Sequence, residues 1–331
     1  MIRHAHIIGC GLAGSLLMHE LHKRNVRVTV TDRLDPNSSS NVAAGMITPV
    51  TGQRLKPTWR GEELTAIARR TYAELEEALN VSLWKDWSLV RVFRSEMMRT
   101  WFEQRRDRGE LDHLNVEALP AGTHDGIEMP YGGFRHGGVA TVHMAALLAA
   151  VRSVHAEAFV DAPAHDADVI ITCTGAATLS DPLWSWLPIE PSKGEILDVR
   201  IDGDHCEYIR TNGTWILPCG DAVFRIGATH DWDDRDPRPT EAARATLLAE
   251  AAKLVQGSIT VLDQRAALRP STKYKRPLIG RHPLDERQAV FTGLGTKGAL
   301  QGPWAAHQIA EHLVNGAPID PEVHIARWWK P

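Results

Sequence analysis

The stretch HAHIIGCGLAG, residues 4–14, decides the fold of this chain. Residues 4–9 predict a short buried strand, and the apolar spacing that follows predicts a helix over residues 12–24. Residues 26–31, VRVTVT, alternate in polarity as a strand does, and Asp32 follows them directly. A strand, a glycine-rich turn, a helix and a second strand form the βαβ unit that opens an α/β domain.

The turn itself has the spacing of a dinucleotide-binding site. Gly9 permits the tight turn, Gly11 lets the backbone approach a pyrophosphate, and Gly14 lets the helix pack close to the strand. The free N–H groups of the helix N-terminus favour a phosphate, and Asp32 can accept hydrogen bonds from ribose hydroxyls. The residues expected at the cofactor are Gly9, Gly11, Leu12, Ala13, Gly14, Asp32 and Arg33.

This turn alone does not separate NAD from FAD, and an ordinary glycine turn in an α/β protein remains the alternative. NADP is disfavoured because Asp32 would repel a 2′-phosphate, although Arg33 beside it weakens that argument.

Composition narrows the class of protein. A chain of 331 residues can form one large domain or two. The formal net charge of -4 disfavours a broad nucleic-acid surface without excluding one. No apolar run is long enough to cross a membrane, and the N-terminus has no cleavable signal pattern, so the cytoplasm is the expected compartment.

The cysteines and histidines predict neither a disulfide framework nor a metal site. The four cysteines are far apart and form no CxxC pair. His19 and His22 share a face of the first predicted helix, but the sequence shows no carboxylate or third ligand beside them. We therefore expect no metal.

The rest of the chain alternates between α/β and antiparallel patterns. Gly and Pro make residues 120–138 look like a connector, and a strand is expected near residues 157–160. Thr240 is the expected N-cap of one helix. Helices are predicted over residues 59–80, 95–108, 141–152, 240–255 and 298–315, and strands over residues 84–93, 168–173, 192–229 (several), 258–268 and 289–292. This order predicts one domain assembled from three separated pieces, with a second domain built from the insertions.

Six later segments carry a family resemblance, from near the N-terminus to about Gly316. They are SSSNVAAGMITPV (38–50), ITCTGAAT (171–178), PSKGEILDV (191–199), WILPCGDAVFRIGATHD (215–231), ALRPSTKYKRPLIGRHP (267–283) and GLGTKGALQGPWAAHQIAEHLVNG (293–316). Together, and in this order, they resemble the D-amino acid oxidase superfamily of FAD enzymes, the glycine oxidases in particular.

The resemblance implies an α/β fold with a Rossmann-type FAD-binding domain of the glutathione-reductase-like, D-amino acid oxidase type. That domain would comprise residues 1–50, 135–190 and 275–331. An α+β substrate domain on an antiparallel sheet would comprise residues 51–134 and 191–274. Further flavin contacts implied by the resemblance are Asn41, Ala43, Ala44, Gly45, Met46, Val160, Thr174, Gly175, Gly293, Gly295, Thr296, Lys297, Gly298, Ala299 and Leu300.

The resemblance also implies roles on the substrate side. Arg269 resembles a clamp for a substrate carboxylate, since a guanidinium matches a carboxylate with two parallel hydrogen bonds. The alternative is a structural arginine held by a buried carboxylate or carbonyl. Trp215 and His230 map to the same site, but Trp215 could be plain core and His230 could lie at the surface. Lys297 could join the helix N-terminus in raising the flavin reduction potential, or could lie outside.

The sequence departs from the family pattern at several points. Asp32 replaces a common glutamate, Trp215 replaces a frequent tyrosine, and Thr296 with Lys297 replaces an Arg-Asn pair. No cysteine follows the Leu-Arg-Pro block, where related enzymes attach flavin covalently, so we expect non-covalent FAD. These departures concern the substrate more than the fold.

The expected function is FAD-dependent oxidation of an amine, above all an amino acid or an N-substituted glycine. Hydride would pass to flavin N5 and leave an imine, and O2 or another acceptor would reoxidise the flavin. One alternative is a tRNA wobble-uridine (carboxymethylaminomethyl) oxidoreductase, whose Gly-x-Gly-Ser-Arg-Gly turn is closer to GLGTKG at residues 293–298. Oxidation of a specialised metabolite and flavin binding without turnover are the others. The sequence leaves the substrate, its chirality, the acceptor and the oligomeric state open.

Overall fold

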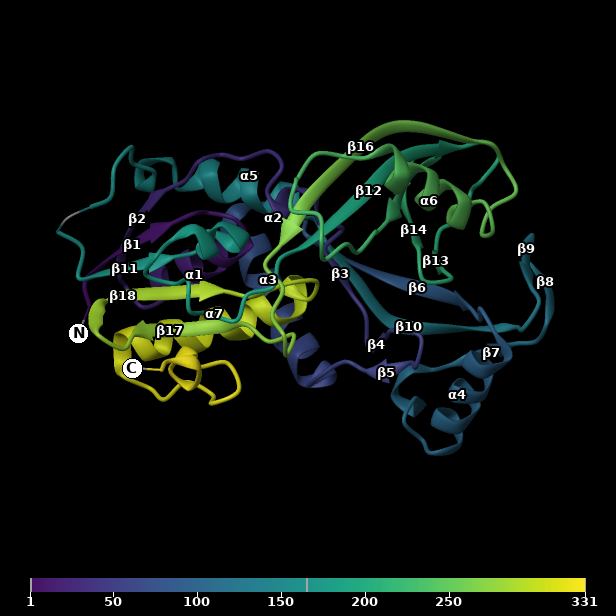
Figure 1. The fold of residues 1–331 in the computed structure, drawn as a ribbon, viewed down its shortest axis with the longest axis horizontal. Helices are drawn as coiled ribbons and strands as arrows, with labels where there is room; N and C mark the ends of the chain where they lie inside the picture. The colour runs from purple at the N-terminus through teal and green to yellow at the C-terminus, as the bar shows by residue number, and fades with distance from the viewer. Residues whose placement is uncertain (1, 165, 331) are drawn as a thin grey trace.

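The computed structural model describes residues 2–164 and 166–330, which form two parts side by side along the long axis (Figure 1). One part is built on a five-stranded, mostly parallel sheet and the other on a nine-stranded, mostly antiparallel sheet. The expected α/β fold with an inserted antiparallel sheet is therefore confirmed. No helix in the described ranges is both long enough and apolar enough to span a bilayer.

The parallel sheet places four strand ends at one edge. β1 pairs in parallel with β2 and β11, β11 pairs in parallel with β18, and β17 runs antiparallel at the outside. Because parallel strands point the same way, their carboxyl ends line one crevice. The strands are β17 (Leu278–His282), β18 (Asp285–Thr292), β11 (Val169–Thr172), β1 (His4–Ile8) and β2 (Arg27–Thr31), in spatial order.

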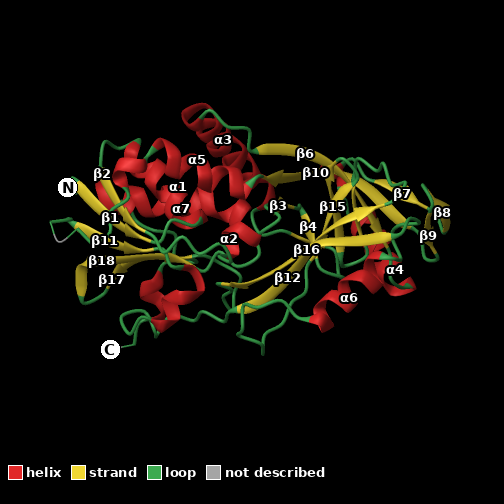
Figure 2. Cartoon of the chain, turned by 90° about the horizontal axis from the view of Figure 1, so that it is seen from above, coloured by secondary structure: helices red, strands yellow, loops and turns green. Residues whose placement is uncertain are grey.

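Four helices cover one face of this sheet (Figure 2). α1 and α7 can pack closely because both contact points on α7 are glycines. A Cβ on Gly298 would lie 3.0 Å from the Leu12 side chain, and one on Gly302 would lie 2.7 Å from the Leu16 side chain. The helices are α1 (Leu12–His22), α3 (Gly61–Leu79), α5 (Met144–Val154) and α7 (Gly298–Asn315).

The nine-stranded sheet forms the second part. Its spatial order is β16 (Ile259–Arg269), β12 (Ser192–Ile201), β15 (Val223–Gly227), β14 (Trp215–Gly220), β13 (Ile209–Thr211), β6 (Trp84–Val92), β10 (Gly133–Val142) and β3 (Met46–Ile47), with β7 (Glu117–Leu119) also on β10. The remaining elements are α2 (Ser39–Val42), α4 (Glu96–Asp107), α6 (Glu241–Ala251) and the hairpins β4–β5 (Val50–Thr51, Lys56–Pro57) and β8–β9 (Gly122–His124, Ile127–Met129).

The predicted helices agree with the structure, and Thr240 caps α6 by accepting a hydrogen bond from the Ala243 N–H. Two expectations were wrong. Residues 120–138 contain β8, β9 and the start of β10, because their glycines make hairpin turns. Residues 156–158 form a 3-10 helix, with only an isolated bridge from Phe159 to Val30. The edge strand β17 was not predicted from the sequence.

The structure also bears on the predicted domain boundary at residue 135. β10 continues to Val142 and pairs there with β6 of the nine-stranded sheet. Residues 135–142 therefore lie in the sheet of the second part, although the sequence had assigned them to the FAD-binding domain.

Partly buried histidines make the stability of this fold pH-dependent. Burial, together with the nearby His155 and His19, lowers the pKa of His22 to about 4, and its ring lies 4.8 Å from that of His155. Because the unfolded chain protonates this histidine near pH 6.5, the unfolding free energy falls as pH drops from 6.5 toward 4.

We expect His22→Gln to remove about 1–2 kcal/mol of the stability difference between pH 8 and pH 5. Urea unfolding of the wild type and the variant at both pH values, at fixed FAD, measures this. His113→Gln, at an exposed position, is the matched control and should leave the difference unchanged. An equal pH dependence in His22→Gln would show that His22 does not contribute.

Candidate functional site: a dinucleotide crevice facing a buried arginine

The crevice lies at the carboxyl ends of the parallel strands. Gly9 follows β1, Asp32 follows β2, Thr174 and Gly175 follow β11 after one residue, and Gly293 follows β18. The Thr292 hydroxyl donates to the Gly175 carbonyl at 3.1 Å and joins two of these ends. Ligands of open α/β sheets bind at such an edge.

The glycine turn has the geometry that its spacing predicts. Gly9 has φ +92° and donates its N–H to the Thr31 carbonyl at 2.7 Å. A Cβ on Gly14 would overlap the Gly9 carbonyl, and one on Gly11 would lie 2.9 Å from Ser40 Oγ. Gly11 is the N-cap of α1 and supplies no capping side chain.

The first turn of α1 therefore offers backbone donors beside two positions that exclude a side chain. Leu12 and Ala13 lie in this turn, and the Leu12 N–H donates to Ser40 Oγ at 2.9 Å. This is the chemistry that a dinucleotide pyrophosphate needs, so the residues present fit FAD.

Asp32, the residue predicted to bind the ribose, already has a partner within the protein. Asp32 Oδ2 lies 3.2 Å from Arg152 Nη2 of α5, so the carboxylate is held at the strand end by a cation. Arg33 is exposed beside it. Val160 donates its N–H to the Val30 carbonyl at 2.9 Å and keeps 37% of its surface exposed.

The segment from Asn41 to Met46 runs between the two sheets. Asn41 Nδ2 donates to the Asp35 carbonyl at 3.0 Å, and Ala43 is exposed. Gly45 has φ +64°, and a Cβ there would overlap the Val142 carbonyl of β10. Ala44 and Met46 pack against a cluster of the nine-stranded sheet that includes Trp87 and Leu89.

The turn before α7 closes the crevice. Gly293 and Gly295 have φ +78° and +49°, and the Gly295 N–H donates to the Pro270 carbonyl at 3.1 Å. This bond ties the turn to the residue after Arg269. Thr296 is exposed, Lys297 is the N-cap of α7, and Gly298, Ala299 and Leu300 are buried in its first turn.

Arg269 ends β16, and its side chain crosses β12 at Gly194, where a Cβ would overlap the guanidinium. Its Nη1 and Nη2 both donate to the Thr229 carbonyl at 3.2 Å, and Nη1 also lies 3.3 Å from the Lys193 carbonyl. Carbonyls hold this arginine, but no carboxylate in residues 2–164 and 166–330 forms an ion pair with it. Burial lowers the pKa of Arg269 to about 10.

His230 and Trp215 lie near Arg269 on the same face of the sheet. His230 is exposed, with Nδ1 3.4 Å from Arg269 Nη1, and burial of its ring together with Arg269 and Lys275 lowers its pKa. Trp215 packs with Val42 and with Ala267, two residues before Arg269. Trp215 therefore belongs in part to the hydrophobic core, and it packs where the two parts of the molecule meet.

Sequence reasoning missed two buried groups on this face, Arg91 of β6 and His136 of β10. The only signal was a charged residue inside the apolar run LVRVF, residues 89–93. An arginine that is 91% buried in a strand needs a partner or a function.

A substitution at Gly194 tests the position of Arg269 without touching Arg269 itself. We expect Gly194→Ala to lower kcat/KM for carboxylate substrates about 10- to 100-fold, since displacing a buried charge-assisted contact costs about 1.5–3 kcal/mol. Added to Arg269→Leu, it should have little further effect. Gly61→Ala, whose Cβ would be in ordinary contact at 3.5 Å, is the control. Full additivity in the double variant would contradict the assignment.

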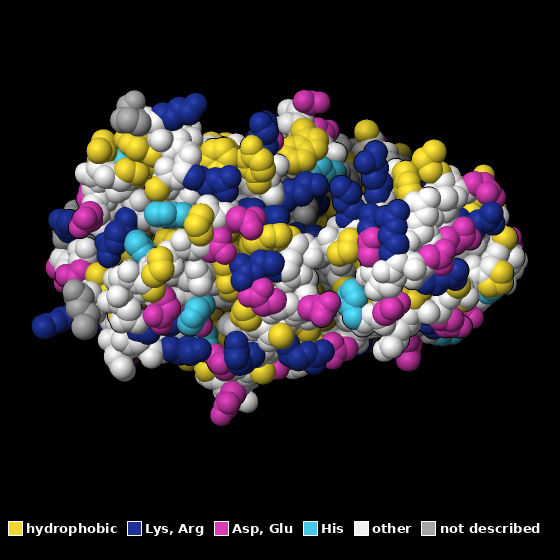
Figure 3. Space-filling model, turned by 90° about the horizontal axis from the view of Figure 1, so that it is seen from below, with side chains coloured by type: hydrophobic (Ala, Val, Ile, Leu, Met, Phe, Trp, Pro, Cys, Tyr) yellow, Lys and Arg dark blue, Asp and Glu magenta, His cyan; other side chains and the backbone are white. Residues whose placement is uncertain are grey.

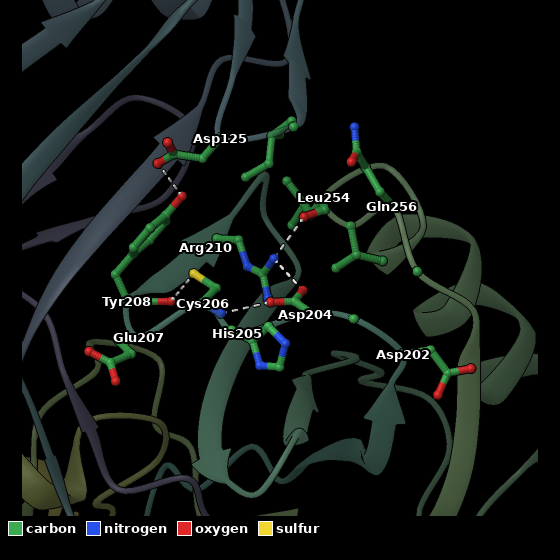
Figure 4. Close-up of a pocket in the computed structure, with 15 residues that line it drawn as sticks. Asp125, Asp202, Asp204, His205, Cys206, Glu207, Tyr208, Arg210, Leu254 and Gln256 are labelled. Carbon is green, nitrogen blue, oxygen red and sulfur yellow. Dashed lines mark hydrogen bonds and ion pairs between the residues drawn. The ribbon is translucent and has the colours of Figure 1, made fainter.

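A cavity of about 730 Å³ lies at the far end of the second part (Figure 4). Asp125, Asp202 and Glu207 make its lining acidic, and Arg210 within it is already paired with Asp204 at 2.7 Å. It contains none of the crevice residues, so it is separate from this site.

The structure also corrects the view that His19 has no carboxylate near it. His19, Glu20 and Glu74 place ligand-type atoms within 4.8 Å of one another. Lys23 lies 2.6 Å from Glu74, and Arg24 lies 2.6 Å from Glu20. These carboxylates are thus neutralised by cations of the chain.

Comparisons with known proteins show the family of this chain. The family model described as FAD dependent oxidoreductase (DAO) matches residues 4–312. The glycine oxidase of Pseudomonas aeruginosa is 24% identical over 95% of this chain and 95% of its own. The tRNA 5-methylaminomethyl-2-thiouridine biosynthesis bifunctional protein of Caulobacter vibrioides is 26% identical over 93% of this chain, which spans 53% of that protein.

Solved structures show the same fold. The iminodiacetate oxidase of Chelativorans sp. BNC1 superposes with a TM-score of 0.79 at 22% identity, covering 98% of both chains. The glycine oxidase of Geobacillus kaustophilus gives a TM-score of 0.80 at 20% identity, again over 98% of both chains. The chain therefore belongs to the D-amino acid oxidase family of FAD-dependent oxidoreductases.

Proposed function

We propose that this enzyme oxidises the CH–NH or CH–NH2 group of a small carboxylate-bearing amine, an amino acid or an N-substituted glycine. The observation that carries the proposal is Arg269, a guanidinium without an ion-pair partner among the described residues, set beside the crevice for FAD. A cation held by carbonyls alone is complementary to a carboxylate.

FAD, bound non-covalently, would take up the hydride from the carbon next to nitrogen. The nitrogen loses a proton, a C=N bond forms, and water then releases the amine and a carbonyl compound. O2 or another acceptor would take up the two electrons that the cofactor supplies to the reaction. Arg269 fixes the carboxylate and hence the orientation of the reacting C–H, and positioning supplies much of the rate in such a step.

The neighbouring residues have supporting roles in this proposal. Trp215 limits the space beside the substrate, and neutral His230 accepts from Arg269 through Nδ1 and keeps its guanidinium in place. Lys297 is the N-cap of α7, and its positive charge would also favour the reduced form of a cofactor bound nearby.

Mixing the purified protein anaerobically with amino acids, N-alkyl glycines and simple amines tests the proposal. Bleaching of the flavin absorbance by a carboxylate-bearing amine supports it. Absence of bleaching by every amine, with flavin bound, contradicts it. Acid precipitation should leave FAD in the supernatant, and flavin in the pellet would contradict non-covalent binding.

A second candidate is oxidation of a modified base in tRNA. Two observations favour it: the relative from Caulobacter vibrioides and the Lys and Arg side chains gathered around a hollow between the two parts (Figure 3). Binding of tRNA with a steep salt dependence, together with no reduction by free amino acids, would support this candidate.

A further inference from the structure

Arg91 lies on the same face of the nine-stranded sheet as the residues that meet the flavin domain. Directly opposite residues of an antiparallel pair share a face, and so do alternate residues of a strand. Arg91 is opposite Phe134 and Leu89 is opposite His136, so these four side chains share one face. Leu89 belongs to the cluster against which Ala44 and Met46 pack, which identifies that face as the one toward the crevice.

The surroundings of Arg91 leave its charge uncompensated. It is 9% exposed, its Nη2 lies 3.5 Å from the Val50 carbonyl, and its buried Nε has no hydrogen-bond partner. His136 beside it is 2% exposed and has no partner at Nε2. No carboxylate of the chain as described forms an ion pair with Arg91.

Lys297 reaches the same short segment from the other part of the molecule. Its Nζ lies 3.3 Å from Thr48 Oγ1, two residues before Val50, and it forms no ion pair within the described residues. Burial first, and then Arg91 and Lys275, lower the pKa of Lys297 to about 8. Arg91 and Lys275 are therefore close enough to repel it.

Lys275 also lies near His230, which contacts Arg269. Arg91 is buried, Lys297 and Arg269 are partly buried, and Lys275 is exposed; none of these four cations is neutralised by a carboxylate in the described part of the chain. An unpaired cation that is largely withdrawn from water is unfavourable in a free protein. Such an arrangement is complementary to more than one negative charge.

We infer that the substrate is a dianion: Arg269 binds the carboxylate next to the oxidised carbon–nitrogen bond, and Arg91 with Lys297 binds a second carboxylate. The substrate class is therefore an amino acid or N-substituted glycine with two carboxylates. This inference rests on the proposed function for its first carboxylate, while the second site stands on Arg91 and Lys297 alone.

Binding of non-oxidisable acids to the FAD-loaded enzyme tests the second site without turnover. Malonate, succinate and glutarate are titrated against acetate, propionate and butyrate, and the shift of the flavin spectrum gives each Kd. We expect at least one dicarboxylate to bind about 100-fold more tightly than its monocarboxylate counterpart. Equal affinities for all pairs would overturn the inference.

Substitutions then test which residues cause the preference for dicarboxylates. Arg91→Met should reduce the dicarboxylate preference to about threefold or less, and Arg91→Lys should restore part of it. Arg135→Met is the matched control, because Arg135 lies opposite Val90, on the other face of the sheet, and is paired with Asp125 at 3.2 Å. Its preference should equal that of the wild type.

Two further outcomes complete the test. If Arg91→Met does not fold, Lys297→Met must lower the preference, and an unchanged preference overturns the inference. If Arg91→Met keeps the preference but lowers the flavin reduction potential, the cation serves the cofactor and the inference is wrong.

The inference and the proposed function can fail separately. Tight dicarboxylate binding without flavin reduction by any amine would refute amine oxidation and leave the second site standing. If N-methylglycine and N-carboxymethylglycine reduce the flavin equally well, amine oxidation is supported and the second carboxylate site is refuted.

Discussion

Arg269→Leu lowers kcat/KM for carboxylate-bearing amines about 10³-fold, mostly through KM. The substitution removes a charge-assisted pair from a buried site and leaves the substrate carboxylate unpaired, which costs about 4 kcal/mol. Because Arg269 is held by the Thr229 and Lys193 carbonyls and not by an acid, its loss leaves no unpaired carboxylate among the described residues. The fold should therefore survive, with FAD still bound.

Two measurements distinguish an Arg269 that binds the substrate carboxylate from an Arg269 that only stabilises the fold. Arg269→Lys should keep the charge but lose the two parallel bonds, so its KM should lie between those of the wild type and Arg269→Leu. An amine without a carboxylate should be oxidised equally poorly by all three proteins. An unchanged KM for a carboxylate substrate in Arg269→Leu would refute the clamp.

Gly11→Val yields a folded but colourless protein. A Cβ on Gly11 would lie 2.9 Å from Ser40 Oγ, and the further bulk of valine at the start of α1 should keep a pyrophosphate away from the backbone. Losing two charge-assisted hydrogen bonds of about 1.5–3 kcal/mol each lowers FAD affinity about 10²- to 10⁴-fold. The ratio of flavin to protein absorbance after purification, and FAD titration of the apoprotein, measure the effect.

The double variant Gly11→Ala with Ser40→Ala is the control for a purely local clash. A Cβ on Gly11 would lie 2.9 Å from Ser40 Oγ, so removing the hydroxyl relieves that contact. If Ser40 were the only obstacle, the double variant would bind FAD like the wild type. Persistent loss of FAD would show that the pyrophosphate itself needs the glycine.

The crevice was predictable because its determinants are local. The turn at Gly9, Gly11 and Gly14 lies within one strand–helix connection, and the obstacle to a side chain at Gly14 is the Gly9 carbonyl of the same turn. The helix α7, its N-terminal turn and its stop at Gly316 likewise follow from neighbouring residues.

The strands of the second part were less predictable, since pairing partners are distant in sequence. β10 has a bulge between His136 and Val139. Its glycines are typical of a connector in the sequence, and only the pairing with β6 shows that they belong to a strand. The edge strand β17 depends on β18 for the same reason.

The sequence by itself determined the dinucleotide turn, the family fold and the candidacy of Arg269. The turn rests on spacing within one segment, and the other two rest on the resemblance of six segments to one family in the same order. Only the tertiary structure decided that Arg269 crosses Gly194 and that Arg91 lies unpaired on the face toward the crevice. Strand register and the absence of a carboxylate partner among the described residues arise from chain segments tens to hundreds of residues apart. Charge compensation is a property of neighbours in space, and no pattern along the chain reports it.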